Sequence, residues 1–150
     1  MNKIRRALAV AATAASALVL TSSPASAAPN WQSWVPTTYT KCGETTPSKT
    51  SDKVVNQTCM LMNQNGSAQG VLLVRNNASV SITVDTATVY WLFGDGTGPA
   101  QSPASCGKKV LVPGELAACY GVTVYPAMGI PVQSSYMYNG IKTITKPVYY

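Results

Sequence analysis

The sequence predicts an all-β fold, a small antiparallel β-sandwich of the immunoglobulin-like kind with about seven or eight strands and two disulfides. Three observations predict it. Strand and turn signals recur about every ten residues after the first 27. Helical signals are almost absent from that part of the chain, and it also holds all four cysteines of the sequence. One domain accommodates it, because a chain of this length can bury a hydrophobic core.

Residues 1–27 have the pattern of a secretory signal peptide. Three cations fall within the first six residues, residues 7–20 form an uncharged run rich in Ala, Leu and Val, and Ala25-Ser26-Ala27 resembles a cleavage site. A membrane anchor is the alternative, but the run is shorter than the roughly 18 to 20 residues that span a bilayer. We therefore expect a secreted, extracellular protein without a membrane anchor.

The charge pattern gives no sign of nucleic-acid binding. The formal net charge is +6, and three of the eleven Lys and Arg residues belong to the predicted leader. The others are scattered, with Lys108-Lys109 the only adjacent pair, so they form no basic stripe that could neutralise a phosphate backbone.

The cysteines predict two disulfides, because an even number in an exported chain is typical of a disulfide framework. Three pairings of Cys42, Cys59, Cys106 and Cys119 are possible. Chain order favours Cys42–Cys59 and Cys106–Cys119, since each pair encloses a short segment. A metal site is not expected, because the sequence has neither CxxC spacings nor histidines.

We divide the exported part into an N-terminal arm or strap, residues 28–41, and a β-sandwich domain, residues 42–150. The first predicted strand of the domain covers residues 54–62 and the second covers residues 70–75. Asn65-Gly66 lies between them, a pair that tight hairpins prefer because it tolerates positive φ. The unbroken apolar run of the second strand predicts burial on both of its faces.

The next segments alternate clearly. Residues 79–85 predict a strand with Val80, Ile82 and Val84 facing the core. Residues 88–93 predict a separate strand that carries Trp91. A glycine-rich turn follows, and we expect a loop to continue from there as far as Cys106.

Residues 108–112 and 116–124 predict the two arms of a hairpin around Pro113-Gly114. That hairpin would place Cys106 nearly opposite Cys119, with a bulge absorbing the difference in register. It therefore supports the disulfide between them.

Residues 132–138 and 141–148 predict the last hairpin, because Asn139-Gly140 lies between them. Tyr136 and Tyr138 would share a face of it, close to the terminal tyrosines. Such a cluster is either a binding platform or an ordinary cross-strand ladder that covers the protein's own sheet.

The residues for catalysis are scarce, so we predict that the protein is not an enzyme and uses no cofactor. The chain contains no histidine, which excludes the usual general base and the histidine-dependent nucleophile arrangements. Paired cysteines leave no thiolate. The five carboxylates lie mostly in predicted turns, and the glycines around Asp95 suit a turn better than a phosphate loop, because no helix follows them.

The arm supplies the candidate partner-binding residues, which are Trp31, Trp34, Val35 and Tyr39. Its two prolines disfavour a helix, so the arm can add a strand to a partner or lie in a groove. The alternative is that it folds over its own sandwich and is held by Cys42–Cys59. On a strand the two indoles would face opposite ways, whereas on a polyproline II segment they would share a face.

Three functions fit these features. The first is a non-catalytic interaction subunit that joins partner proteins. The second is a secreted protease inhibitor, with a reactive loop at residues 99–106 or at residues 126–131 with Met128 as the inserted side chain. The third is a carbohydrate- or cell-wall-binding module that stacks sugars on Trp91 or on the terminal tyrosines.

The cysteine spacing, the segment "LVPGELAACYGVTV" and the tryptophan-containing arm resemble small exported bacterial β-proteins. Among these, the layout resembles the adaptor subunit of umbrella toxin particles. The resemblance implies partners of two kinds, a lectin-like propeller subunit and a large repeat-bearing toxin polypeptide. It also implies that residues 28–39 form a strap that docks in a cleft of the lectin-like subunit, while the β-domain holds the toxin.

Overall fold

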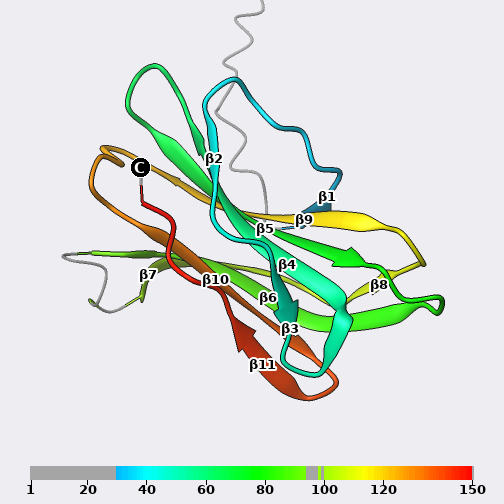
Figure 1. Cartoon of the computed structure of the whole chain (residues 1–150). Coiled ribbons are helices and arrows are strands. Elements are labelled where there is room, and N and C mark those ends of the chain that lie inside the picture. The colour runs from blue at the N-terminus through cyan, green and yellow to red at the C-terminus, as the bar shows by residue number, and fades with distance from the viewer. Residues whose placement is uncertain (1–29, 94–97, 99, 150) are drawn as a thin grey trace, which may run out of the picture.

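The computed structural model describes residues 30–93, 98 and 100–149. They form two antiparallel sheets packed face to face (Figure 1), which confirms the predicted all-β sandwich. The predicted signal peptide and most of the turn at residues 94–99 lie outside the described residues. The described strands number eleven, more than expected, mainly because several have only two or three residues.

The first sheet has six strands in the order β1-β9-β5-β4-β2, with β3 also paired to β4. Its members are β1 (Trp31–Gln32), β2 (Thr40–Cys42), β3 (Thr46–Ser48), β4 (Ser51–Met62), β5 (Ala68–Asn76) and β9 (Leu116–Val124). The second sheet has five strands in the order β11-β10-β6-β7, with β8 also paired to β6. Its members are β6 (Ile82–Leu92), β7 (Ala100–Cys106), β8 (Lys109–Leu111), β10 (Val132–Tyr138) and β11 (Ile141–Ile144).

Both hairpins predicted from Asn-Gly pairs are present. β4 pairs with β5 and β10 pairs with β11, each antiparallel. Gly66 has a φ of +80°, and Asn139 and Gly140 have φ values of 51° and 71°. Two successive positive φ values define the turn whose twist matches that of the flanking strands.

The apolar run of β5 is buried on both faces, as predicted. Leu72 and Val74 join the core between the sheets. Val71 and Leu73 belong to a smaller cluster on the outer face, where Trp34 of the arm covers them. The arm therefore explains why this strand lacks a polar face.

The prediction of two strands between residues 79 and 93 is wrong, because β6 runs without a break from Ile82 to Leu92. The pairing register of β6 shifts where it meets Met137 and Tyr138 of β10. The side chains of β6 that face the core therefore switch from even-numbered to odd-numbered positions, although the strand continues. Val80 precedes the strand and is exposed, contrary to the prediction that it faces the core.

The loop expected before Cys106 is instead strand β7, paired with β6. The sequence does not predict this strand because its serines and its proline are more typical of a loop. Most of its side chains are exposed, and β7 lies at the edge of its sheet, where a proline costs no internal ladder bond.

The hairpin expected around Pro113-Gly114 is also wrong. β8 pairs with β6 in one sheet and β9 pairs with β5 in the other, so the turn crosses between the layers. The Cys106–Cys119 disulfide forms all the same, with a Cα–Cα distance of 5.9 Å. It joins β7 to β9 and therefore ties the two sheets together.

A glycine pair lets the sheets approach closely. Gly70 and Gly121 lie on the first sheet, and a Cβ built on either would come within 2.8 Å of Val89 of the second. Val89 thus occupies space that a side chain would otherwise fill. Beside it, the buried Trp91 donates its indole N–H to the carbonyl oxygen of Val122 at 3.0 Å.

Hydroxyl and amide groups join the sheets at another place. The Thr58 hydroxyl of β4 contacts that of Ser134 on β10 and donates to Thr145 Oγ1 at 2.7 Å. Asn56 Nδ2 donates to the hydroxyl of the buried Tyr136 at 3.2 Å. Burial raises the pKa of Tyr136. Every buried side-chain polar atom of the described residues has a partner, as burial of such groups requires.

Candidate functional site

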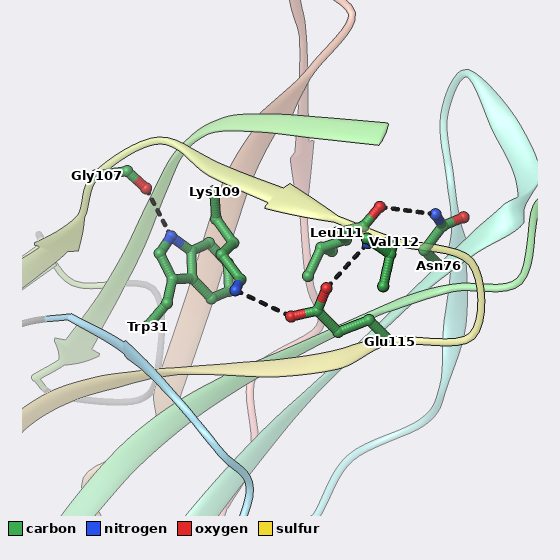
Figure 2. Close-up of polar contacts among 7 residues, drawn as sticks. All are labelled: Trp31, Asn76, Gly107, Lys109, Leu111, Val112 and Glu115. Carbon is green, nitrogen blue, oxygen red and sulfur yellow. Dashed lines mark hydrogen bonds and ion pairs between the residues drawn. The ribbon is translucent and has the colours of Figure 1, made fainter. Parts of the chain in front are cut away.

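The arm begins as an added strand of the protein's own first sheet. In β1, Trp31 pairs with Cys119 of β9, and its ring is half-buried against the core between the sheets. The indole N–H donates to the carbonyl oxygen of Gly107 at 2.6 Å (Figure 2). Trp31 therefore anchors the start of the arm to both sheets, since Gly107 follows β7.

An ion pair lies beside this indole. Lys109 Nζ is 2.9 Å from Glu115 Oε1, and the lysine side chain runs alongside the Trp31 ring in Figure 2. The backbone N–H of Val112 donates to Glu115 Oε2 at 2.9 Å. The hydrogen bond from Lys109, followed by that from Val112, lowers the pKa of Glu115. The carboxylate is held ionised, which is the opposite of what a general acid needs.

Trp34 packs on the opposite face from Trp31, as expected for two indoles three residues apart on an extended chain. It covers the outer face of the first sheet over a cluster formed by Cys59, Leu61, Val71, Leu73 and Ala118, with Tyr120 beside it. The Tyr120 hydroxyl accepts a hydrogen bond from Val35 N at 3.3 Å.

The end of the arm is fixed as well. β2 pairs with β4, and the predicted Cys42–Cys59 disulfide is present between residues directly opposite each other. Of the two alternatives, the structure therefore has the arm over its own sandwich, with Trp31 and Trp34 partly buried against the chain's own sheets.

The other two arm residues face outward. Val35 is 65% exposed and Tyr39 is 49% exposed. Tyr39 and Met128 line a hollow of about 370 Å³ that also contains Met62 and Gly66. Tyr125, 73% exposed, lies over Gly66. We call Tyr39, Tyr125 and Met128 the aromatic–methionine end of the sandwich.

A second feature, missed in the sequence, lies on the outer face of the first sheet where the arm stops covering it. Strand register places Val55, Arg75 and Leu116 in one row across β4, β5 and β9, with Gln57 and Leu73 in the next. These residues, with Trp34, Thr45, Asn56 and Asn77, line a hollow of about 360 Å³. We call it the Trp34 groove.

Met128 and Trp91, proposed from the sequence for protease inhibition and for sugar stacking, are not placed as these functions require. Met128 is 82% exposed but occupies a turn closed by Ile130 N donating to Ala127 O at 3.1 Å, with Gly129 at a φ of +74°. A protease binds an extended segment, so this conformation does not suit an inhibitory loop. Trp91 is buried and offers no ring face to a sugar, whereas the terminal Tyr149 is 49% exposed. Tyr150 lies outside the described residues.

The comparisons with known proteins give no family. No protein-family model matches the chain, and no curated protein matches it significantly. Within residues 30–93, 98 and 100–149 there is no helix long and apolar enough to cross a membrane. The same residues contain no group of three His, Cys, Asp or Glu side chains that could hold a metal ion. The two disulfides are consistent with an oxidising compartment.

Proposed function

We propose that the protein is a secreted, non-catalytic interaction subunit that binds a partner protein through the aromatic–methionine end. The observation that carries the proposal is the exposure of Tyr39, Tyr125 and Met128 at one end of a disulfide-bonded sandwich. Tyrosine and methionine are enriched at protein interfaces, where they bury large apolar areas.

The packing of the arm supports this proposal. Trp31 and Trp34 face inward, and the Cys42–Cys59 disulfide follows the arm directly, so Tyr39 projects from a fixed backbone. A surface that is ordered before binding loses less conformational entropy when the partner arrives. In this proposal the tryptophans position the arm, while Tyr39 contacts the partner and Val35 extends the exposed surface.

The resemblance to umbrella toxin adaptors supplies a specific form of the proposal. The partners would then be a lectin-like propeller subunit and a repeat-bearing toxin polypeptide. Tyr39 on the strap would contact the propeller, and the remaining faces of the sandwich would be open to the toxin.

The test is purification of the tagged protein from the culture medium of its source, with mass spectrometry of the proteins that accompany it. The variant Tyr39→Ser/Tyr125→Ser/Met128→Ser should lose the partner that the natural sequence retains. The control is Val110→Ser/Val112→Ser, which alters two exposed valines near the β8–β9 turn.

Both variants should unfold within about 2 °C of the natural sequence, because exposed substitutions change stability little. Recovery of the same partner by the triple variant would exclude the aromatic–methionine end. Recovery of the natural sequence alone would reject the adaptor.

A further inference from the structure

The Trp34 groove combines an apolar floor with one cation. Val55 and Leu116 flank Arg75 in the same row of the sheet, and Leu73 lies in the next row toward Trp34. Arg75 is exposed, and it has no ion pair or side-chain hydrogen bond with the described residues. A guanidinium in this position can bind a carboxylate with two parallel hydrogen bonds.

Trp34 differs from the other two tryptophans in its N–H group. The indole N–H groups of Trp31 and Trp91 donate to backbone carbonyls. That of Trp34 has no hydrogen bond with the part of the chain that the structure describes. Since no buried side-chain polar atom there is without a partner, the Trp34 N–H is open to solvent. The groove is therefore lined by an indole whose N–H donor is unused by the described residues.

We propose that the Trp34 groove binds an acidic saccharide, a sugar ring that carries a carboxylate. The C–H face of the ring packs on the indole and against Leu116, which is 36% exposed, while the carboxylate pairs with Arg75. Thr45, Gln57 and Asn77 supply polar groups around the groove for the hydroxyls. A volume of about 360 Å³ accommodates such a unit.

A peptide fits this groove less well than a sugar. The groove lies on the face of the sheet, where the backbone groups of β4, β5 and β9 are already paired with one another. A peptide main chain lying there would lose water from its own N–H and C=O groups without gaining backbone partners. Peptides that add to a sheet use its edge instead.

The experiment is an NMR titration of the ¹⁵N-labelled protein, from residue 28 onward, at constant salt. The probes are methyl β-glucuronide and methyl β-glucoside, which differ only in the carboxylate. The Trp34 indole N–H signal should shift saturably with the glucuronide, and the glucoside should bind at least tenfold more weakly. Sodium acetate, at equal concentration, should leave that signal unshifted because it lacks the ring.

Arg75→Gln should reduce glucuronide binding to the glucoside level. Lys142→Gln, which removes an exposed cation from the other sheet, should leave binding unchanged. Unfolding temperatures of both variants establish that they are folded. Equal binding of the two glycosides, an unaffected Arg75→Gln variant, or an unmoved Trp34 signal would each overturn the proposal. So would tighter binding of a blocked aspartyl peptide, which would make the occupant a protein.

Discussion

The side chain of Asn76 joins two separate segments of the chain at one end of the sandwich. Its Nδ2 donates to Val80 O at 2.9 Å and to Leu111 O at 3.0 Å, and its Oδ1 accepts from Ala78 N at 2.9 Å. The side chain is fully buried. It therefore fixes both the turn that begins β6 and the end of β8, the second contact being visible in Figure 2.

Replacing this residue should be costly. Asn76→Ala should lower the free energy of unfolding by about 2 to 4 kcal/mol, because buried carbonyls lose their donors. Urea unfolding measures the change. The neighbouring Asn77→Ala is the control, since Asn77 is exposed and should change stability by less than about 0.5 kcal/mol. Equal effects of the two variants would contradict the role of the Asn76 amide.

Glu115 should make a small pH-dependent contribution to stability. Because its pKa is lowered in the folded protein, the ionised form stabilises the fold above the unfolded-state pKa. That stabilisation is lost as the pH falls through the folded-state pKa. Glu115→Gln should therefore be less stable than the natural sequence at pH 7, by less than about 1 kcal/mol in free energy of unfolding, and the difference should shrink as the pH falls below the ordinary pKa of a glutamate.

The matched control for this prediction is Glu44→Gln. The pKa of Glu44 is also lowered by a lysine, Lys146, but both side chains of that pair are largely exposed to solvent. Water and salt screen such a pair, so no measurable effect is expected. Thermal unfolding from pH 3 to pH 7 compares the variants, and a difference for Glu115→Gln that does not shrink as the pH falls would refute the ionic explanation.

At the scale of elements, the arm is part of the fold. It pairs through β1 with β9 and through β2 with β4, and Trp34 covers a cluster on the sheet between these two contacts. The arm therefore contributes to stability through its inward residues and leaves its outward residues for other contacts.

Trp34→Ala should lower the free energy of unfolding by about 2 to 3 kcal/mol, because it removes a partly buried indole and uncovers the apolar cluster beneath it. Val35→Ala, one residue away and pointing outward, should change it by less than about 0.5 kcal/mol. Chemical unfolding compares the two. If the Trp34 variant is as stable as the Val35 variant, the arm does not pack as the structure shows.

Elements could be predicted from sequence where the signal is local. An Asn-Gly pair forms its turn from its own backbone preferences, so both such hairpins were predictable. A Pro-Gly turn does not reveal whether its arms pair or diverge into different sheets, and for β8 and β9 they diverge. β7 was missed because an edge strand needs few apolar residues.

At the scale of the whole molecule, the two disulfides have different positions. Cys106–Cys119 connects the sheets and both of its residues are buried, whereas Cys42–Cys59 connects neighbouring strands and Cys42 is exposed. Their sequence separations, 13 and 17 residues, imply similar restriction of the unfolded chain.

Cys106→Ala/Cys119→Ala should therefore cost more stability than Cys42→Ala/Cys59→Ala. Each double variant should lose about 3 kcal/mol of the stabilisation that a disulfide gives by restricting the unfolded chain. The Cys106/Cys119 variant should lose roughly 1 kcal/mol more, because it leaves a cavity between the sheets. Urea unfolding of both double variants measures the order. A larger loss for the Cys42/Cys59 variant would contradict this order and show that the disulfide at the end of the arm contributes more to stability.

The candidate sites show what a sequence reveals at this scale. Tyr39 and Met128 were singled out separately in the sequence. They form one surface only because the fold brings the turn that carries Met128 next to the distant N-terminal arm. Arg75 was missed because the groove appears only when the registers of β4, β5 and β9 are known. Long-range register of this kind is not contained in a local pattern.

Val89, seated between Gly70 and Gly121, also has a mechanical consequence. Sliding one sheet over the other would drive the Val89 side chain into the atoms that surround the two glycines. Separating the sheets would not, so this contact opposes sliding more than separation. The sandwich should therefore resist shear between its two sheets. If the protein joins two larger proteins, as proposed above, it can transmit a shearing load between them with little change in its own shape.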